Sequence, residues 1–190
     1  MPTNVWSEPI YYAYGPNGNV QFENGNVLMN GEKIASQQQF AESAAVLATV
    51  PPPENEEIAE EAEWMPLGTF ALSTNEKELE PTRIMQLAVS RDGIITGSLY
   101  NTLTDSSQIL QGSVDPDTQR VAFKVGQSGK AIMETGLFNL TQDETPVLVH
   151  FENEKTETYL LVRLEAPEGE GESEDRVDST ELDAIFGPSK

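Results

Sequence analysis

The sequence predicts a mainly β protein: an eight-stranded antiparallel up-and-down barrel, preceded by a small β-meander and one helix. Residues 84–101 have the pattern of a hairpin, because apolar and polar residues alternate on both sides of the loop Arg91-Asp92-Gly93. A Gly-x-apolar step recurs in the second half of the chain, and glycine inside a strand is typical of a curved or closed sheet. Eight strand-like segments with short connections complete the pattern.

Residues 1–50 are predicted to form a separate lobe. Ile10 to Tyr14 is expected to be a short aromatic strand. Asn24-Gly25 and Asn30-Gly31 then predict two tight hairpins, because Asn and Gly tolerate positive φ at both central turn positions. The apolar face of this meander is expected to consist of Val20, Phe22, Val27, Met29 and Ile34.

A helix is predicted to begin at Ser36, because Ser36 and Gln39 fit a capping box and good helix formers follow. Phe40, Ala44 and Leu47 fall on one stripe of this helix. We therefore expect the lobe to dock through this stripe, since so small a meander is marginal by itself.

Residues 51–63 are predicted to be a linker. Pro51-Pro52-Pro53 ends the helix, because proline lacks the backbone N–H that a helix interior needs. The glutamate-rich stretch 54–63 is then either a solvated helical turn or a flexible acidic link, with a specific cation site as a further alternative.

Residues 64–165 are predicted to form the barrel, with a two-sheet sandwich as the alternative. A closed sheet of eight strands either fills with side chains or holds one small ligand. The predicted strands are 66–73, 84–90, 94–101, 108–115, 119–126, 131–139, 146–152 and 157–165. The side chains expected in the lumen are Leu72, Leu87, Val89, Leu99, Val121, Phe123 and Leu160.

Residues 166–190 are predicted to be a disordered acidic tail, because so few apolar groups cannot offset the entropy of ordering the chain. Within it, residues 178–187 have a helix-start pattern followed by an apolar stripe of Leu182, Ile185 and Phe186. This stripe is either a docking peptide that folds on a protein partner or an incidental chain end.

Composition excludes several function classes. The net charge of −21 argues against a nucleic-acid backbone or an anionic membrane as partner, because both would be repelled. The absence of cysteine excludes disulfides, thiolate zinc sites and cysteine nucleophiles. No apolar run is long enough for membrane insertion, and the first residues have no signal-peptide pattern.

No residue has the sequence surroundings of a catalytic, cofactor-binding or metal site. The single histidine, His150, has no evident nucleophile or orienting partner and is expected at a rim or on the surface. Asp115 and Asp117 fit a turn better than a calcium loop. Asn139-Leu140-Thr141 matches a glycosylation sequon of the kind that arises by chance, and Trp64 is expected to plug the barrel end rather than contact a ligand.

Several motifs between Trp64 and Leu164 resemble the C-terminal module of a planctomycete family of surface or exported proteins labelled mu-protocadherin-like. The segments that carry the resemblance are Trp64 to Leu72, Gln86 to Val89, Gly112 to Asp115, Thr118 to Arg120, Asn139 to Pro146 and Leu148 to Phe151. The meander and helix add to the resemblance, which covers about residues 6–165. It implies a cell-surface, periplasmic or secreted protein and supplies no catalytic residues. The strand pattern is also similar to that of calycin barrels such as avidins and lipocalins.

The sequence as a whole predicts a non-enzymatic interaction or structural module with a protein partner and no cofactor. The alternative is a carrier that holds a small apolar ligand in the barrel lumen. The volume of the lumen discriminates between them, because a packed lumen favours interaction and an open pocket favours a carrier.

Overall fold

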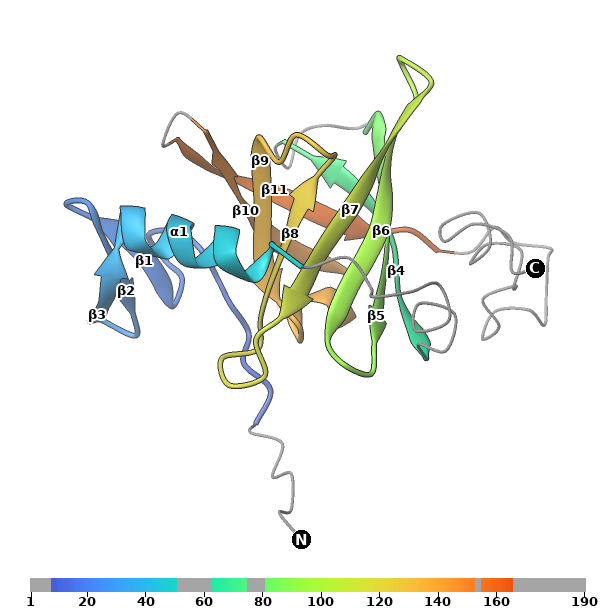
Figure 1. Ribbon diagram of the computed structural model, residues 1–190. Helices are drawn as coiled ribbons and strands as arrows, with labels where there is room; N and C mark the ends of the chain where they lie inside the picture. The colour runs from blue at the N-terminus through green and yellow to red at the C-terminus, as the bar shows by residue number, and fades with distance from the viewer. Residues whose placement is uncertain (1–7, 51–62, 75–80, 153–154, 166–190) are drawn as a thin grey trace, which may run out of the picture.

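The computed structural model describes residues 8–50, 63–74, 81–152 and 155–165. These residues form a mainly β molecule, in which a closed barrel stands beside a three-stranded sheet and one helix (Figure 1). Residues 51–62 of the predicted linker lie outside the described residues. So does the predicted tail 166–190, with its candidate docking residues Leu182, Ile185 and Phe186.

The barrel consists of eight antiparallel strands. They are β4 (Trp64–Ser73), β5 (Arg83–Ser90), β6 (Ile94–Asn101), β7 (Ser106–Val114), β8 (Arg120–Val125), β9 (Ala131–Gly136), β10 (Glu144–Phe151) and β11 (Thr156–Arg163). Each strand pairs with its neighbours in the chain, and β11 pairs with β4 to close the sheet. The predicted up-and-down barrel is confirmed, and the sandwich alternative is wrong because β4 and β11 leave no open edge.

The lumen is filled by side chains that alternate along the strands, as the period-2 pattern predicts. Residues with at most 8% exposure form its core cluster: Phe70, Leu72, Met85, Leu87, Val89, Ile95, Leu99, Leu110, Val121, Phe123, Met133, Leu140, Val147, Val149 and Leu161. Val114 packs on the cluster and is half-buried. The expectation for Leu160 is wrong by one residue, because Leu161 is the buried member of β11.

Two strand-interior glycines permit close approach of neighbouring backbones. A Cβ atom on Gly97 would lie 1.9 Å from the carbonyl oxygen of Gln86, and one on Gly112 would lie 1.9 Å from that of Ala122. The recurring Gly-x-apolar step therefore has the structural basis that the sequence indicates, because any side chain at either position would push adjacent strands apart.

One end of the barrel is closed by the 3-10 helix η1 (Asn139–Thr141). Leu140 of this helix is fully buried in the core cluster. The Arg163 guanidinium donates to the carbonyls of Leu67 and Leu140 and lies 4.8 Å from the ring centre of Phe70. The expectation that Trp64 plugs the barrel is wrong, because Trp64 pairs with Ser90, which the alternation of β5 places on the outward face.

The N-terminal lobe contains β1 (Val20–Glu23), β2 (Asn26–Met29) and β3 (Glu32–Ser36). Asn24, Gly25, Asn30 and Gly31 all have positive φ, which confirms the two tight turns. Ile34 is 51% exposed, contrary to expectation. The reason is a β-bulge in the β2–β3 pairing. Val27 pairs with Ala35 and Leu28 pairs with Lys33, so Ile34 has no paired residue in β2 and the side-chain alternation of β3 is reversed at this point.

The segment before these strands differs from its prediction. Residues 8–13 are not a strand, and Tyr14 forms only an isolated parallel bridge with Val20. Helix α1 (Gln37–Leu47) begins with the predicted capping box of Ser36 and Gln39.

Helix α1 lies against the outer wall of the barrel, with the three-stranded sheet beyond it (Figure 1). Ala44 and Ala48 pack on Ala122 and Ile132 of the barrel, which confirms docking through the helix stripe. Ser113 Oγ also donates to the carbonyl of Leu47 over 2.5 Å. No helix in the described part of the chain is both long and apolar enough to cross a bilayer.

Candidate functional site

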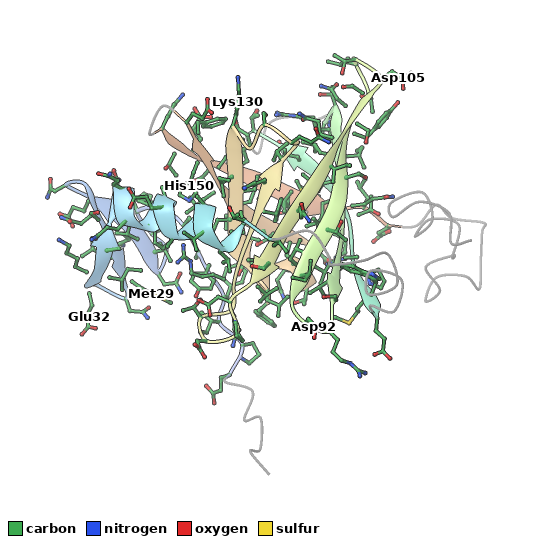
Figure 2. All side chains as sticks on the ribbon, viewed as in Figure 1. Met29, Glu32, Asp92, Asp105, Lys130 and His150 are labelled. Atoms are coloured by element: carbon green, nitrogen blue, oxygen red, sulfur yellow. The ribbon has the colours of Figure 1, made fainter. Side chains whose placement is uncertain are left out.

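Three titratable side chains lie in a row on the outer wall of the barrel, beneath the lobe. Arg120, Glu134 and His150 come from β8, β9 and β10, at outward-facing positions of neighbouring strands. Their side chains are 15%, 0% and 6% exposed. Figure 2 shows His150 on the side of the barrel that faces the lobe. We call these three residues the buried polar cluster.

Arg120 joins the barrel to the lobe. Its Nη2 lies 2.6 Å from Glu134 Oε2, and its Nη1 donates to Ser43 Oγ of α1 over 2.9 Å. The guanidinium also lies 4.2 Å from the ring centre of Phe40. A planar cation that is held by a carboxylate and covered by an aromatic ring fixes orientation as well as contributing energy. The lobe is therefore oriented on the barrel by Arg120.

Burial shifts the pKa values of the other two members of the cluster in opposite directions. Desolvation raises the pKa of Glu134 to about 7, although Arg120 opposes this change. Desolvation, helped by Arg120, lowers the pKa of His150 to about 4. Both effects follow from the cost of placing a charge away from water. At neutral pH the His150 imidazole is therefore uncharged, and the Glu134 carboxylate is the group that pairs with Arg120.

Several polar atoms of this region are sealed from solvent. His150 Nδ1 contacts Thr156 Oγ1 at 3.0 Å, but His150 Nε2 lies 3.9 Å from Glu134 Oε2, beyond hydrogen-bond distance. His150 Nε2, Glu134 Oε1 and the Tyr14 hydroxyl are buried and have no hydrogen-bond partner among the described residues. An acid and a base of this kind resemble catalytic groups, but Phe40 and the lobe cover them. The arrangement acts as a joint between the lobe and the barrel.

Beside this cluster, two side-chain amides hold residues 8–13 against the barrel. Asn139 Oδ1 accepts from the backbone N–H of Tyr12, and Asn139 Nδ2 donates to the Tyr12 carbonyl, both over 2.8 Å. Gln119 Oε1 accepts from the N–H of Ile10 over 2.9 Å, and Gln119 Nε2 donates to the carbonyl of Glu8 over 3.0 Å. We call Gln119 and Asn139 the amide clamp.

The clamp is shaped around Tyr12. Asn139 is fully buried, and the Tyr12 hydroxyl donates to the Thr118 carbonyl over 2.5 Å. A Cβ atom on Gly136 would lie 2.5 Å from Tyr12 Cδ2, so only glycine leaves room for the ring. Gln119 has a φ of 61°, a left-handed conformation that costs a residue of this type roughly 1–3 kcal/mol. The backbone strain therefore lies at Gln119, the residue whose side chain supplies the second amide of the clamp.

The outer wall formed by β5, β6 and β7 is uncharged. Outward-facing residues of β5, β6 and β7 are Ile84, Gln86, Ala88, Ser90, Ile94, Thr96, Ser98, Tyr100, Ser107, Ile109, Gln111 and Ser113. Tyr100, Leu103 and Ile109 on the β6–β7 hairpin are 38%, 78% and 62% exposed. Figure 2 shows the tip of this hairpin at Asp105 and the far end of the barrel at Asp92. We call Tyr100, Leu103 and Ile109 the hairpin patch.

A groove of about 400 Å³ lies at the barrel mouth near Lys130, which Figure 2 labels. It is open to solvent, and its lining is mainly charged. The lining residues are Lys130, Phe151, Glu152, Lys155 and Glu157. The groove is an open surface feature at the barrel mouth and not an enclosed cavity within the lumen.

The structure places some of the candidate residues singled out in the sequence where they were expected and others elsewhere. The expectation for His150 is wrong, because it is buried under the lobe. Asp115 Oδ1 accepts from the N–H of Asp117 over 2.9 Å, as the predicted turn requires. Asn139, the sequon residue, has its amide engaged by Tyr12. Among the described residues there is no group of three or more side chains suited to metal binding.

Sequence reasoning missed Arg120, Glu134 and Gln119. A signal for the first two was present, because Arg120, Glu134 and His150 take outward positions in three consecutive predicted strands. Gln119 carries no such signal, since its partners lie more than 100 residues earlier.

Comparisons of the chain with protein-family models, with curated proteins and with solved structures found no match.

Proposed function

We propose that the chain is a non-enzymatic interaction module of an exported or envelope-associated protein. The observation that carries this proposal is the packed lumen, whose core side chains are buried against one another. Barrels that carry small molecules keep an apolar cavity of about 300 Å³ or more for the ligand. A barrel filled with its own side chains instead offers its outer wall and loops for binding. The location in the cell rests on the resemblance to the exported family.

The hairpin patch is the surface that we assign to this function. On a chain with a net charge of −21, the outer wall of β5–β7 has no charged side chain, and the hairpin exposes one aromatic and two aliphatic residues. A neutral wall with aromatic and aliphatic groups has the composition of an interface centre, which is depleted in charge. The acidic remainder of the molecule limits non-specific association around it.

Site-specific crosslinking in the organism that makes the protein tests this proposal. A photo-crosslinking residue in place of Leu103 is expected to give one discrete protein adduct. The adduct should disappear when Ile109→Glu is added, because a charge would be placed in the contact. The matched control is a crosslinker at Asp92, at the other end of the barrel, which should give no discrete adduct.

Native mass spectrometry on protein from the same source tests the carrier alternative, because it detects a bound small molecule. A small molecule bound at one equivalent, together with no adduct at position 103, would overturn the interaction proposal in favour of the carrier.

A further inference from the structure

The amide clamp contacts the backbone of an extended segment at alternate residues. Its partners are the carbonyl of Glu8, the N–H of Ile10 and both backbone groups of Tyr12. Domains that bind peptides by strand addition use the same spacing, with main-chain hydrogen bonds for affinity and pockets for alternate side chains. Here the side-chain amides replace the edge of a sheet, which a closed barrel does not have.

The amide clamp and the groups that contact the Tyr12 ring edge and hydroxyl belong to the barrel. Gln119 and the Thr118 carbonyl precede β8, Gly136 ends β9 and Asn139 lies in η1. The hydrogen bonds from the clamp to residues 8–12 connect positions 109 to 127 residues apart. The barrel therefore presents the hydrogen-bonding part of the site, whereas the apolar groups around Ile10 and Tyr12 include Val20, Val27 and Phe40 of the lobe. The residues that the clamp holds are separated from it by most of the chain.

The requirements on the bound segment are few. The clamp contacts only backbone groups, so it accepts many side chains at positions 8, 9 and 11. Tyr12 is the exception, because its ring lies over Gly136 and its hydroxyl bonds Thr118. Ile10, two residues earlier, packs on the apolar cluster that includes Tyr12. The pattern selected is thus apolar-x-tyrosine in an extended conformation.

We propose that the amide clamp is a binding site for an extended peptide of a partner protein with the pattern apolar-x-tyrosine, and that residues 8–13 are its built-in occupant. A tethered occupant competes at an effective concentration in the millimolar range, so a partner peptide binds when the chain's own segment is weakened or released. The site is separate from the hairpin patch, so either proposal can fail without the other.

Binding of a synthetic peptide to the full chain tests this proposal. The probe is a fluorescein-labelled peptide with the sequence of residues 8–15, followed by fluorescence anisotropy. The full-length Tyr12→Ala variant keeps the clamp but weakens its own occupant. We expect saturable binding that is about tenfold or more tighter than binding to the wild-type chain, because the tethered competitor is weakened.

Two matched peptides identify the contacts. N-methylation at the position of Tyr12 removes the N–H that Asn139 accepts, and this peptide should lose binding by about tenfold or more. N-methylation at the position of Tyr11 leaves every hydrogen bond to the clamp in place, and this peptide should bind.

A second variant keeps the test decisive if Tyr12→Ala fails to fold. Asn19 holds the same segment from the lobe side, through the N–H of Ala13 and the carbonyl of Tyr11, so Asn19→Ala loosens the occupant without altering the barrel. Absence of saturable binding to the folded variants overturns the proposal, and so does equal binding of the two N-methylated peptides.

Discussion

The two faces of the barrel wall are stabilised in different ways. The inner face is an apolar cluster in which each side chain is buried by many neighbours. The outer face beneath the lobe combines the apolar packing of α1 on Ala122 and Ile132 with a few directional contacts, from Arg120, Glu134 and Asn139. Apolar burial is non-directional and tolerates substitutions of similar volume, whereas a buried polar group without its partner is costly. The inner face thus specifies the barrel, and the outer face specifies how the lobe sits on it.

The largest expected effect is on the inner face. Phe123→Ala removes a fully buried ring from the middle of the core cluster and should lower the free energy of unfolding by about 3–5 kcal/mol. Urea denaturation measures this change. Ile109→Ala on the neighbouring strand β7 is the matched control, because Ile109 faces outward and is 62% exposed, so a change within about 0.5 kcal/mol is expected. Equal effects of both substitutions would contradict the description of the lumen.

The next effect concerns pH and the buried polar cluster. The pKa of Glu134 is higher in the folded protein than in the unfolded chain, so its contribution to stability is present below about pH 4.5 and is lost as the pH rises through 7. The pKa of His150 is lower in the folded protein, so its contribution is present above about pH 6.5 and is lost as the pH falls through 4. Between these limits the two contributions oppose each other. Burial raises the pKa of Tyr14 well above its ordinary value, so Tyr14 does not titrate in this range.

Single substitutions should separate these opposing contributions. Relative to the wild-type protein, Glu134→Gln should lose stability as the pH is lowered from 6.5 to 4, by up to about 1.4 kcal/mol per pH unit. His150→Asn should instead lose stability as the pH is raised from 4.5 to 7, with a similar limiting slope. Urea midpoints in a series of buffers report both slopes. Slopes of the same sign in the two variants would contradict the opposite pKa shifts of Glu134 and His150.

A smaller effect is expected at the amide clamp. Asn139→Ala leaves the buried N–H and carbonyl of Tyr12 without partners and should cost about 2 kcal/mol. Gln119→Ala, at the more exposed end of the segment, should cost less than about 1 kcal/mol, because water replaces its hydrogen bonds. Limited proteolysis should cut residues 8–13 earlier in Asn139→Ala than in Gln119→Ala. Earlier cleavage in Gln119→Ala than in Asn139→Ala would indicate that residues 8–13 are held mainly through Glu8 and Ile10 and not through Tyr12.

The smallest expected effect lies in the lobe. Ser36→Ala removes the hydroxyl that caps α1 at the N–H of Gln39 and should cost about 1 kcal/mol. Circular dichroism during thermal unfolding measures it. Val46→Ala is the control, because Val46 is 75% exposed and alanine favours helix. A larger loss from Val46→Ala than from Ser36→Ala would indicate that the exposed face of α1 is covered in solution.

The sequence predicted the inner face well because its signal is local. Alternation in each strand shows which residues face the lumen, as for Leu87, Val89 and Leu99. Leu160 is the exception, since both residues 160 and 161 of β11 are leucine and periodicity alone does not choose between them. The capping box at Ser36 and the two Asn-Gly turns are likewise local chemistry.

The outer face could not be predicted in the same way. His150 has an outward position, which in an isolated barrel means solvent, and only the docked lobe buries it. Tyr12 lies in a segment with aromatic spacing typical of a strand, yet amide side chains take the place of a neighbouring strand. Both outcomes depend on pairs of residues more than 100 positions apart. Single-sequence patterns do not carry that information.

The long separation between Asn139 and Tyr12 also has a consequence for biosynthesis. The lobe leaves the ribosome first, but its clamp is completed only when residue 139 has been made, 127 positions later. At about 5–20 residues per second, that interval is roughly 6–25 s. During it the apolar underside of α1 and the ring of Tyr12 have no barrel to cover them. Nascent chains of this protein therefore expose an aromatic, helix-bearing segment for seconds, which is the kind of surface that chaperones bind.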